Sequence, residues 1–179
     1  MQRINVIGTS GSGKSSFSKA LAETLKIQYI ELDAIYWMPN WQEPEIAEFL
    51  DQVAETLRAD SWVLDGNQSR TNAIKWQRVD TIIWLDYSFI RTFKQIMFRS
   101  IQRAWHQKEI WRGTGNTESF RRNFLSSESV ILWMLTNYRK TKRKYRELMQ
   151  DNRMQHIQIV RLQSPDQAEA FLNNLRLPT

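Results

Sequence analysis

The chain has no cysteine and only two histidines, His106 and His156. Without cysteine, neither a disulfide framework nor a thiolate metal site can form, and two histidines argue against a histidine-based metal cluster. No apolar run approaches the roughly 18 residues that a membrane-spanning helix needs. The N-terminus enters a strand-like segment with no apolar signal sequence before it. We therefore expect a cytoplasmic protein that does not contact membranes.

The charge of the chain is unevenly distributed. Its 179 residues, 41% of them hydrophobic, suffice for one domain with a core, and the formal net charge is +6. Residues 91–153 contain fifteen Lys or Arg and five Asp or Glu, a balance of +10 that leaves −4 for the remainder. The basic segment fits a solvated helical surface, an arginine-bearing lid over phosphates, or a nucleic-acid-binding patch.

Short apolar runs alternate with helical patterns, which is typical of βαβ units around a parallel sheet. The predicted strands are residues 3–7, 27–32, 61–64, 81–85 and 155–162. Helices are predicted at 14–25, from Pro44 to Leu57, from Ser88 to Trp105, at 131–148, and after a capping box at Ser164 and Gln167.

The helix after Ser88 has apolar residues at helical spacing, which we expect to face the core: Phe89, Phe93, Ile96, Met97, Ile101 and Trp105. Residues 112–117, with two glycines, are the best candidate for a mobile loop.

Residues 8–15, Gly-Thr-Ser-Gly-Ser-Gly-Lys-Ser, match the phosphate-binding P-loop pattern G-x-x-x-x-G-K-[ST] between a predicted strand and a predicted helix. The glycines let backbone N–H groups point at phosphate oxygens, and the helix N-terminus adds its positive end. Lys14 would contact the β- and γ-phosphates of ATP, and the Ser15 hydroxyl would bind Mg²⁺. The predicted nucleotide-binding residues are Gly8, Ser10, Gly11, Ser12, Gly13, Lys14, Ser15 and Ser16, although the serines 10, 12 and 16 also fit as small turn residues.

Five motifs carry a family resemblance: Val-Ile-Gly-Thr-Ser-Gly-Ser-Gly-Lys-Ser at 6–15, Leu-Asp-Ala-Ile-Tyr-Trp at 32–37, Trp-Val-Leu-Asp-Gly-Asn at 62–67, Ile-Ile-Trp-Leu-Asp at 82–86 and Ile-Val-Arg-Leu at 159–162. The chain resembles the adenylate-kinase-related, nucleoside-monophosphate-kinase-like P-loop kinases, and more closely the bacterial topology modulation protein (FlaR-like) family. The resemblance implies an α/β, three-layer α/β/α P-loop kinase fold with a five-stranded parallel sheet of order 2-3-1-4-5. It also implies a single domain over 1–179, a substrate-side helical insert at about 34–60 and a helical lid at about 99–125.

Asp65 ends an apolar strand, so its carboxylate would lie beside the P-loop and hold Mg²⁺ directly or through water. A strand-end turn residue is the alternative. Adenylate-kinase-like proteins carry Asp-Gly-Phe-Pro-Arg at a similar place, whereas this chain has Asp-Gly-Asn-Gln-Ser-Arg at 65–70. Arg70, which would match the substrate-phosphate arginine, thus comes one position later.

Asp33 follows the second predicted strand and faces the same sheet edge. A kinase that phosphorylates a hydroxyl benefits from a carboxylate that takes the proton, whereas a phosphate acceptor is already anionic. Asp33 therefore favours a hydroxyl acceptor among the nucleosides, nucleotides and other small alcohols. It could instead hold Mg²⁺-bound water or begin a turn.

Several side chains near these carboxylates are suited to an acceptor. Three aromatic side chains could stack on a base or a sugar: Tyr36, Trp37 and Trp41. Core packing is the alternative, above all for Trp41. Asn67 and Gln68 could orient the acceptor.

Arg99 and Arg103 are one helical turn apart and share a face. Arginines on a closing lid would stabilise the charge that develops during phosphoryl transfer, and closure excludes water. By resemblance these two arginines are the first choice for that role. Further candidates are Arg112, Arg121 and Arg122. A solvated basic helix face is the alternative for all of them.

The favoured function is a small-molecule kinase with ATP and Mg²⁺, whose catalytic residues are Lys14, Asp33, Arg99 and Arg103. The alternative is an ATP-binding regulatory or DNA-topology-modulating protein with non-specific nucleic-acid contacts. It is supported by the basic segment and its aromatic residues: Trp105, Trp111, Trp133, Tyr138 and Tyr145. Most of these fall at core-facing spacing and no DNA-reading motif is present, so nucleic acid is not favoured. A monomer and a homodimer are both compatible with the sequence.

Overall fold

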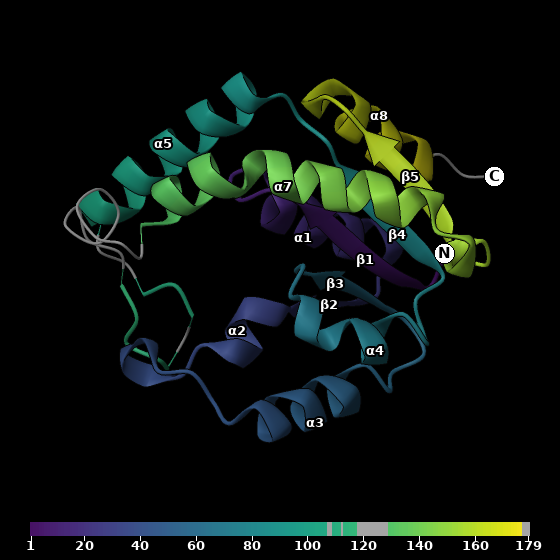
Figure 1. Cartoon of the computed structure of the whole chain (residues 1–179), viewed down its shortest axis with the longest axis horizontal. Helices are drawn as coiled ribbons and strands as arrows, with labels where there is room; N and C mark the ends of the chain where they lie inside the picture. Colours follow the sequence, from purple (N-terminus) through teal and green to yellow (C-terminus); the bar gives the residue numbers. More distant parts are fainter. Residues whose placement is uncertain (107–108, 112, 118–128, 177–179) are drawn as a thin grey trace.

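The computed structural model describes residues 1–106, 109–111, 113–117 and 129–176. Its centre is a five-stranded sheet in which every neighbouring pair is parallel, in the order β2-β3-β1-β4-β5 (Figure 1). The strands are β1 (Arg3–Gly8), β2 (Gln28–Glu31), β3 (Trp62–Asp65), β4 (Thr81–Leu85) and β5 (Gln158–Leu162). The predicted strand order is confirmed.

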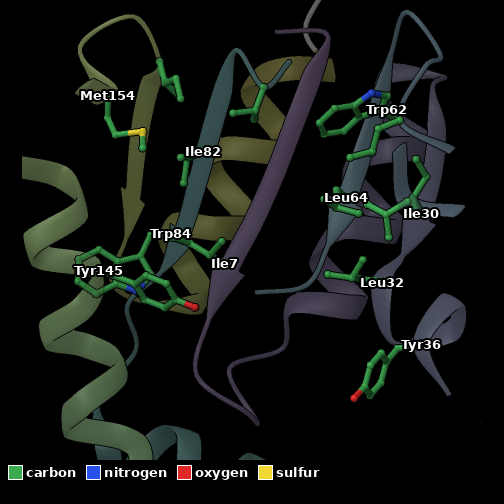
Figure 2. Packing of buried hydrophobic residues seen from close by; sticks show 14 of the residues in the cluster. Ile7, Ile30, Leu32, Tyr36, Trp62, Leu64, Ile82, Trp84, Tyr145 and Met154 are labelled. Carbon is green, nitrogen blue, oxygen red and sulfur yellow. The ribbon is translucent and has the colours of Figure 1, made fainter. Parts of the chain in front are cut away.

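Helices cover both faces of this sheet. On one face α1 (Lys14–Leu25) and α8 (Pro165–Arg176) pack through residues such as Phe17 and Ala168. On the other face lie α3 (Ile46–Thr56), α4 (Asn72–Lys75) and α7 (Val130–Gln150), where Figure 2 shows Tyr145 beside Trp84. The remaining elements are α2 (Leu32–Tyr36), α5 (Phe89–His106) and the 3₁₀ turns η1 (Pro39–Trp41), η2 (Ser69–Thr71) and η3 (Asn152–Met154).

The central strands β1, β3 and β4 are buried along nearly their whole length because both faces of the sheet are covered. Among the buried residues of β1, Asn5 has a polar side chain. Its side-chain amide donates to the carbonyl oxygens of Leu64 and Gly66, both at 3.0 Å. This polar side chain therefore fixes the end of β3 relative to β1, at the edge where the candidate site lies.

The helix starts follow the predicted capping residues. The Ser88 hydroxyl accepts from the backbone N–H of Arg91 at 3.4 Å, and that of Ser164 accepts from Gln167 at 3.2 Å. Strands β2 and β5 are shorter than predicted, and α3 begins two residues after Pro44.

The predicted apolar face of α5 is wrong in part. Phe89, Ile101 and Trp105 are 41%, 46% and 77% exposed, whereas the predicted Ile96 is buried. The buried residues of the helix are Thr92, Ile96, Ser100 and Ala104. These four recur once per turn and are mostly small. The buried face of α5 is therefore suited to close contact with backbone rather than to filling an apolar core.

Residues 109–111 and 113–117 lie against the segment that follows α2 (Figure 1). Glu109 and Thr117 form an antiparallel bridge. The Asn116 side chain accepts from the Trp41 backbone N–H at 3.0 Å and donates to the Met38 carbonyl at 2.9 Å. Asn116 thus attaches this stretch to the turn between α2 and α3.

The division into an insert at 34–60 and a lid at 99–125 stays a prediction. None of the described helices combines the length and apolar character required to cross a lipid bilayer.

Candidate active site

The P-loop, residues 8–15, joins β1 to α1. Gly13 lies at φ 84°, and the Phe17 backbone N–H donates to its carbonyl at 3.0 Å. The Ser12 backbone N–H donates to the Thr9 carbonyl at 3.2 Å, which closes the turn. The predicted nucleotide-binding residues divide by exposure: Ser10, Lys14 and Ser15 line a cavity, Gly8, Gly11 and Ser12 are buried beneath it, and Gly13 and Ser16 are exposed.

That cavity has a volume of about 770 Å³ and opens above the carboxyl ends of the strands. Ligands of open α/β sheets bind at this edge. Residues from four separate places in the chain meet on its walls: Lys14, Ser15, Asp33, Asp65, Arg99 and Arg103. All the predicted catalytic and metal-binding residues thus face one space.

Lys14 lies deep in this cavity, and its ammonium group donates to the Thr9 carbonyl at 3.1 Å. Burial lowers the pKa of Lys14, while the carboxylates of Asp65 and Asp33 act in the opposite direction. The lysine thus stands near both acidic groups, where phosphate oxygens would provide further compensating charge.

Asp65 is buried at the end of β3 and accepts from the Tyr29 hydroxyl at 3.3 Å. Gly66 follows with φ 145°, and a Cβ atom there would lie 2.6 Å from the Cβ atom of Leu32. Only glycine permits this approach of β3 to the start of α2. The contact brings Asp65 close to Asp33, the residue after Leu32.

Asp33 is accessible to water within the cavity, yet the surrounding walls raise its pKa by desolvation. Lys14 and a hydrogen bond from Gln68 oppose this rise, and Asp65 and Glu31 add to it. A carboxylate with a raised pKa is a stronger base than an ordinary aspartate.

The polar pair after β3 orients the site. The Asn67 side-chain amide donates to the Gly8 carbonyl at 3.0 Å, and Gln68 bonds to Asp33. Gln68 also lines the cavity, so it can reach both the carboxylate and a bound molecule.

Arg99 and Arg103 project into the cavity from α5. Arg70 instead donates to the Tyr36 hydroxyl at 3.2 Å and is not on the cavity wall. The other predicted lid arginines lie outside the described residues: Arg112, Arg121 and Arg122.

The far side of the cavity is aromatic, and sequence reasoning captured it only in part. Four tryptophans line it: Trp37, Trp41, Trp111 and Trp133. Trp41, for which core packing was the favoured alternative, lies on the wall.

Three charged lining residues were not anticipated: Glu31, Glu43 and Lys144. Glu31 ends β2, and the rule that strand ends meet at one edge could have found it. Glu43 lies in a loop and Lys144 in a basic run, where no local pattern distinguishes them.

Solved structures resemble this chain over nearly its whole length. A shikimate kinase from Acinetobacter baumannii in complex with shikimate has a TM-score of 0.58 at 15% identity, covering 98% of this chain and 90% of that chain. The chain has the P-loop kinase fold. A gluconokinase from Sinorhizobium meliloti has a TM-score of 0.51 at 17% identity, covering 98% and 93%. A shikimate kinase from Bacteroides thetaiotaomicron has 0.55 at 15%, covering 98% and 96%.

Curated relatives match a shorter stretch. A cytidylate kinase of Chlamydia trachomatis is 41% identical over 54 residues, and the match covers 26% of this chain and 25% of that protein. A cytidylate kinase of Chlamydia muridarum is 39% identical over the same length. The chain matches no family model. The resemblance to topology modulation proteins stays a prediction.

Proposed function

We propose that this protein is an ATP-dependent phosphotransferase that moves the γ-phosphoryl group of ATP to a hydroxyl group of a small molecule. One observation carries the proposal: the P-loop and Asp33 face the same cavity, together with two arginines. The likeness in fold to shikimate kinases and a gluconokinase, and the partial match to cytidylate kinases, agree with it.

The donor side binds the phosphates of ATP. Backbone N–H groups of residues 8–15 and the ammonium group of Lys14 would contact the phosphate oxygens. Arg99 and Arg103 stand on α5 above them and would stabilise the charge that spreads over the transferred group.

The residues present fit a magnesium ion. Ser15 and Asp65 offer a hydroxyl and a carboxylate on the same cavity wall, and Mg²⁺ in kinases takes one or two such ligands together with water and phosphate oxygens. When bound, the ion neutralises phosphate charge.

Asp33 is the proposed base. The acceptor oxygen attacks the γ-phosphorus, the bond from that phosphorus to the β–γ bridging oxygen breaks, and ADP leaves. The acceptor proton passes to the carboxylate of Asp33, whose raised pKa favours the transfer. A substrate-positioning role is the alternative.

We assign acceptor binding to the insert at about 34–60 and closure to the lid at about 99–125. Support comes from Asn116, which joins residues 109–117 to the turn that ends at Trp41. Such an enclosure keeps water from replacing the acceptor.

The test is ADP release measured with and without a panel of hydroxyl compounds. The Lys14→Ala variant should bind ATP at least about tenfold more weakly, since an ion pair to phosphate is lost, with unchanged thermal stability. The exposed Lys94→Ala on α5 is the matched control and should bind ATP normally. Wild-type affinity in Lys14→Ala would remove the donor site from the proposal. ADP release that no acceptor stimulates, but that DNA does, would favour the regulatory alternative.

A further inference from the structure

The acceptor side of the cavity has an aromatic wall, formed by Trp37, Trp41 and Trp111. Half of the eight tryptophans in the chain line this one cavity. The rings of Trp37 and Trp41 are 5.5 Å apart and those of Trp41 and Trp111 5.7 Å apart, both edge to face. The three rings form a continuous surface rather than isolated core contacts.

Hydrogen bonds hold this aromatic wall in place. The indole N–H of Trp111 donates to Glu31 at 3.0 Å, and the backbone of Trp41 donates to Asn116 at 3.0 Å. Indole rings held in advance lose little entropy when a ligand binds. Their negative faces attract cations more strongly than other aromatic side chains do.

Two carboxylates, Glu31 and Glu43, stand beside the aromatic wall. Their partners are neutral: Glu31 accepts from Trp111 and from the Tyr29 hydroxyl at 3.2 Å, and Glu43 bonds to the hydroxyl of Tyr36. Neutral donors leave the negative charge in place. Within the described ranges, neither carboxylate forms an ion pair with a lysine or arginine.

Four cations and four carboxylates line the whole cavity. The proposed function assigns Lys14, Arg99 and Arg103 to the phosphates of ATP, which would take up their charge, and Asp65 to Mg²⁺. Lys144, on α7, donates to the Ser69 hydroxyl at 2.5 Å. With ATP and Mg²⁺ bound, the other charged residues on the cavity walls are three carboxylates, Glu31, Asp33 and Glu43, and one lysine, Lys144.

We infer that the acceptor carries a positively charged nitrogen, as a protonated amine or a quaternary ammonium group, near the hydroxyl that is phosphorylated. Amino alcohols and amino sugars are the chemical classes that fit. The aromatic wall would contact the cation face-on, and the carboxylates would balance its charge. The inference rests on the proposed function and narrows its acceptor.

Neutral rings of a base or a sugar could also stack on tryptophan. The carboxylates therefore decide between a neutral and a cationic acceptor. Asp33 and Glu43 are exposed to water and Glu31 is half-buried, so an acceptor that fills the cavity would displace water from these carboxylates. A neutral acceptor would leave them uncompensated, and an acidic acceptor would add a repulsion. A cationic acceptor removes both penalties.

Matched compounds that differ in charge but little in shape test the inference. One pair is choline and the neutral 3,3-dimethylbutan-1-ol, and a second pair is glucosamine and glucose. The open-chain gluconate is added as an anionic compound and is not matched in shape. Quenching of tryptophan fluorescence, with Mg²⁺ and a non-hydrolysable ATP analogue present, measures binding separately from turnover. In at least one set the cation should bind about tenfold or more tightly than its neutral counterpart, as cation–π contact and ion pairing predict.

The variant Glu43→Gln keeps the shape of the side chain and its contact with Tyr36 while removing the charge. It should lower the preference for the cation several-fold and affect the neutral compound less. Glu48→Gln, which removes a charge from the exposed side of α3 outside the cavity, is the control and should retain the full preference.

Equal binding of cation and neutral compound, tighter binding of gluconate, or no saturable binding of any cation overturns the inference. ADP release with a neutral compound, without preference for cations, leaves the proposed function standing while the inference fails. Preferential cation binding with no ADP release supports the inference about the pocket and contradicts the transfer reaction.

Discussion

At the scale of single residues, Asp33 makes the proposed chemistry testable through pH. A base must be ionised, and desolvation raises the pKa of Asp33 above the ordinary value of 3.8. With an acceptor in hand, kcat/KM should therefore rise with pH through that raised pKa. Asp33→Asn should lower kcat by a factor of about 10²–10⁴ and abolish the rise of kcat/KM with pH, with ATP affinity little changed. If kcat/KM still rises with pH in Asp33→Asn, another group is responsible for the titration.

Lys75 predicts a pH effect on stability rather than on turnover. It is only 1% exposed, and burial, with nearby Lys144 adding to it, lowers its pKa from 10.5 to about 7. Between these values the unfolded chain binds the proton and the folded protein does not, so stability rises with pH across this window.

Lys75→Met should therefore stabilise the protein at pH 7 by a few kcal/mol, at about 1.4 kcal/mol per unit of pKa difference. The gain should shrink as the pH rises towards 10.5, because the proton that the wild-type lysine takes up on unfolding then contributes less free energy. Thermal denaturation from pH 7 to 10 measures both effects. The exposed Lys140→Met is the control, and a gain that does not depend on pH would mean that packing, not charge, is responsible.

Sequence reasoning found the residues whose place follows from a local pattern. Lys14 and Ser15 come from the P-loop motif, and Asp33 and Asp65 follow strands whose carboxyl ends must meet at one edge of a parallel sheet. Sequence reasoning did not identify Glu43 and Lys144 as residues of the cavity. Their positions depend on the path of a loop and on the rotation of α7, which no short-range spacing encodes.

At the scale of elements, the P-loop and α5 are coupled through Gly11. A Cβ atom on Gly11 would lie 2.7 Å from the Cβ atom of Ile96 and 2.9 Å from the carbonyl oxygen of Thr92. The same residue has φ 83°. The helix that carries Arg99 and Arg103 therefore rests directly on the phosphate-binding loop.

Gly11→Ala should displace α5 from the P-loop, because neither backbone nor a branched Cβ atom can yield easily. We expect a loss of about 1–3 kcal/mol in stability and a weaker affinity for ATP. Gly115→Ala is the control, since Gly115 also has a positive φ, 68°, but no atom within 4 Å of an added Cβ. Equal losses in the two variants would attribute the effect to backbone strain alone, not to the contact with α5.

The resemblance to P-loop kinases implied the correct order of the strands, whereas apolar spacing did not predict the orientation of α5. Apolar spacing along that helix pointed to a face that includes Trp105, which is 77% exposed. The buried face carries Thr92 and Ser100 because it must approach a loop rather than an apolar core. Binary patterning fails where a helix packs on backbone, and that occurs at the candidate site.

At the scale of the whole molecule, three segments contribute to the cavity wall: α5, residues 109–111 and the turn after α2. Asn116, 1% exposed, is the tie between the last two. Its side chain makes both hydrogen bonds to Trp41 and Met38, and its carbonyl accepts from the Ile110 backbone at 2.9 Å. One side chain thus connects residues 109–111 and 113–117 to the turn that carries Trp41.

Asn116→Ala removes both side-chain hydrogen bonds and leaves the backbone one. At about 0.5–1.5 kcal/mol each, their loss should raise the KM for the acceptor about 5- to 150-fold. ATP affinity should change little, because the P-loop is not touched. Water should then compete better with the acceptor, so ADP release without acceptor should rise relative to acceptor phosphorylation. Asn173→Ala on the exposed face of α8 controls for the loss of an amide. A lower acceptor affinity without added hydrolysis of ATP would mean that Asn116 only positions Trp41. A lower acceptor affinity together with added hydrolysis would establish that the contact of Asn116 with Trp41 and Met38 also excludes water from the transfer.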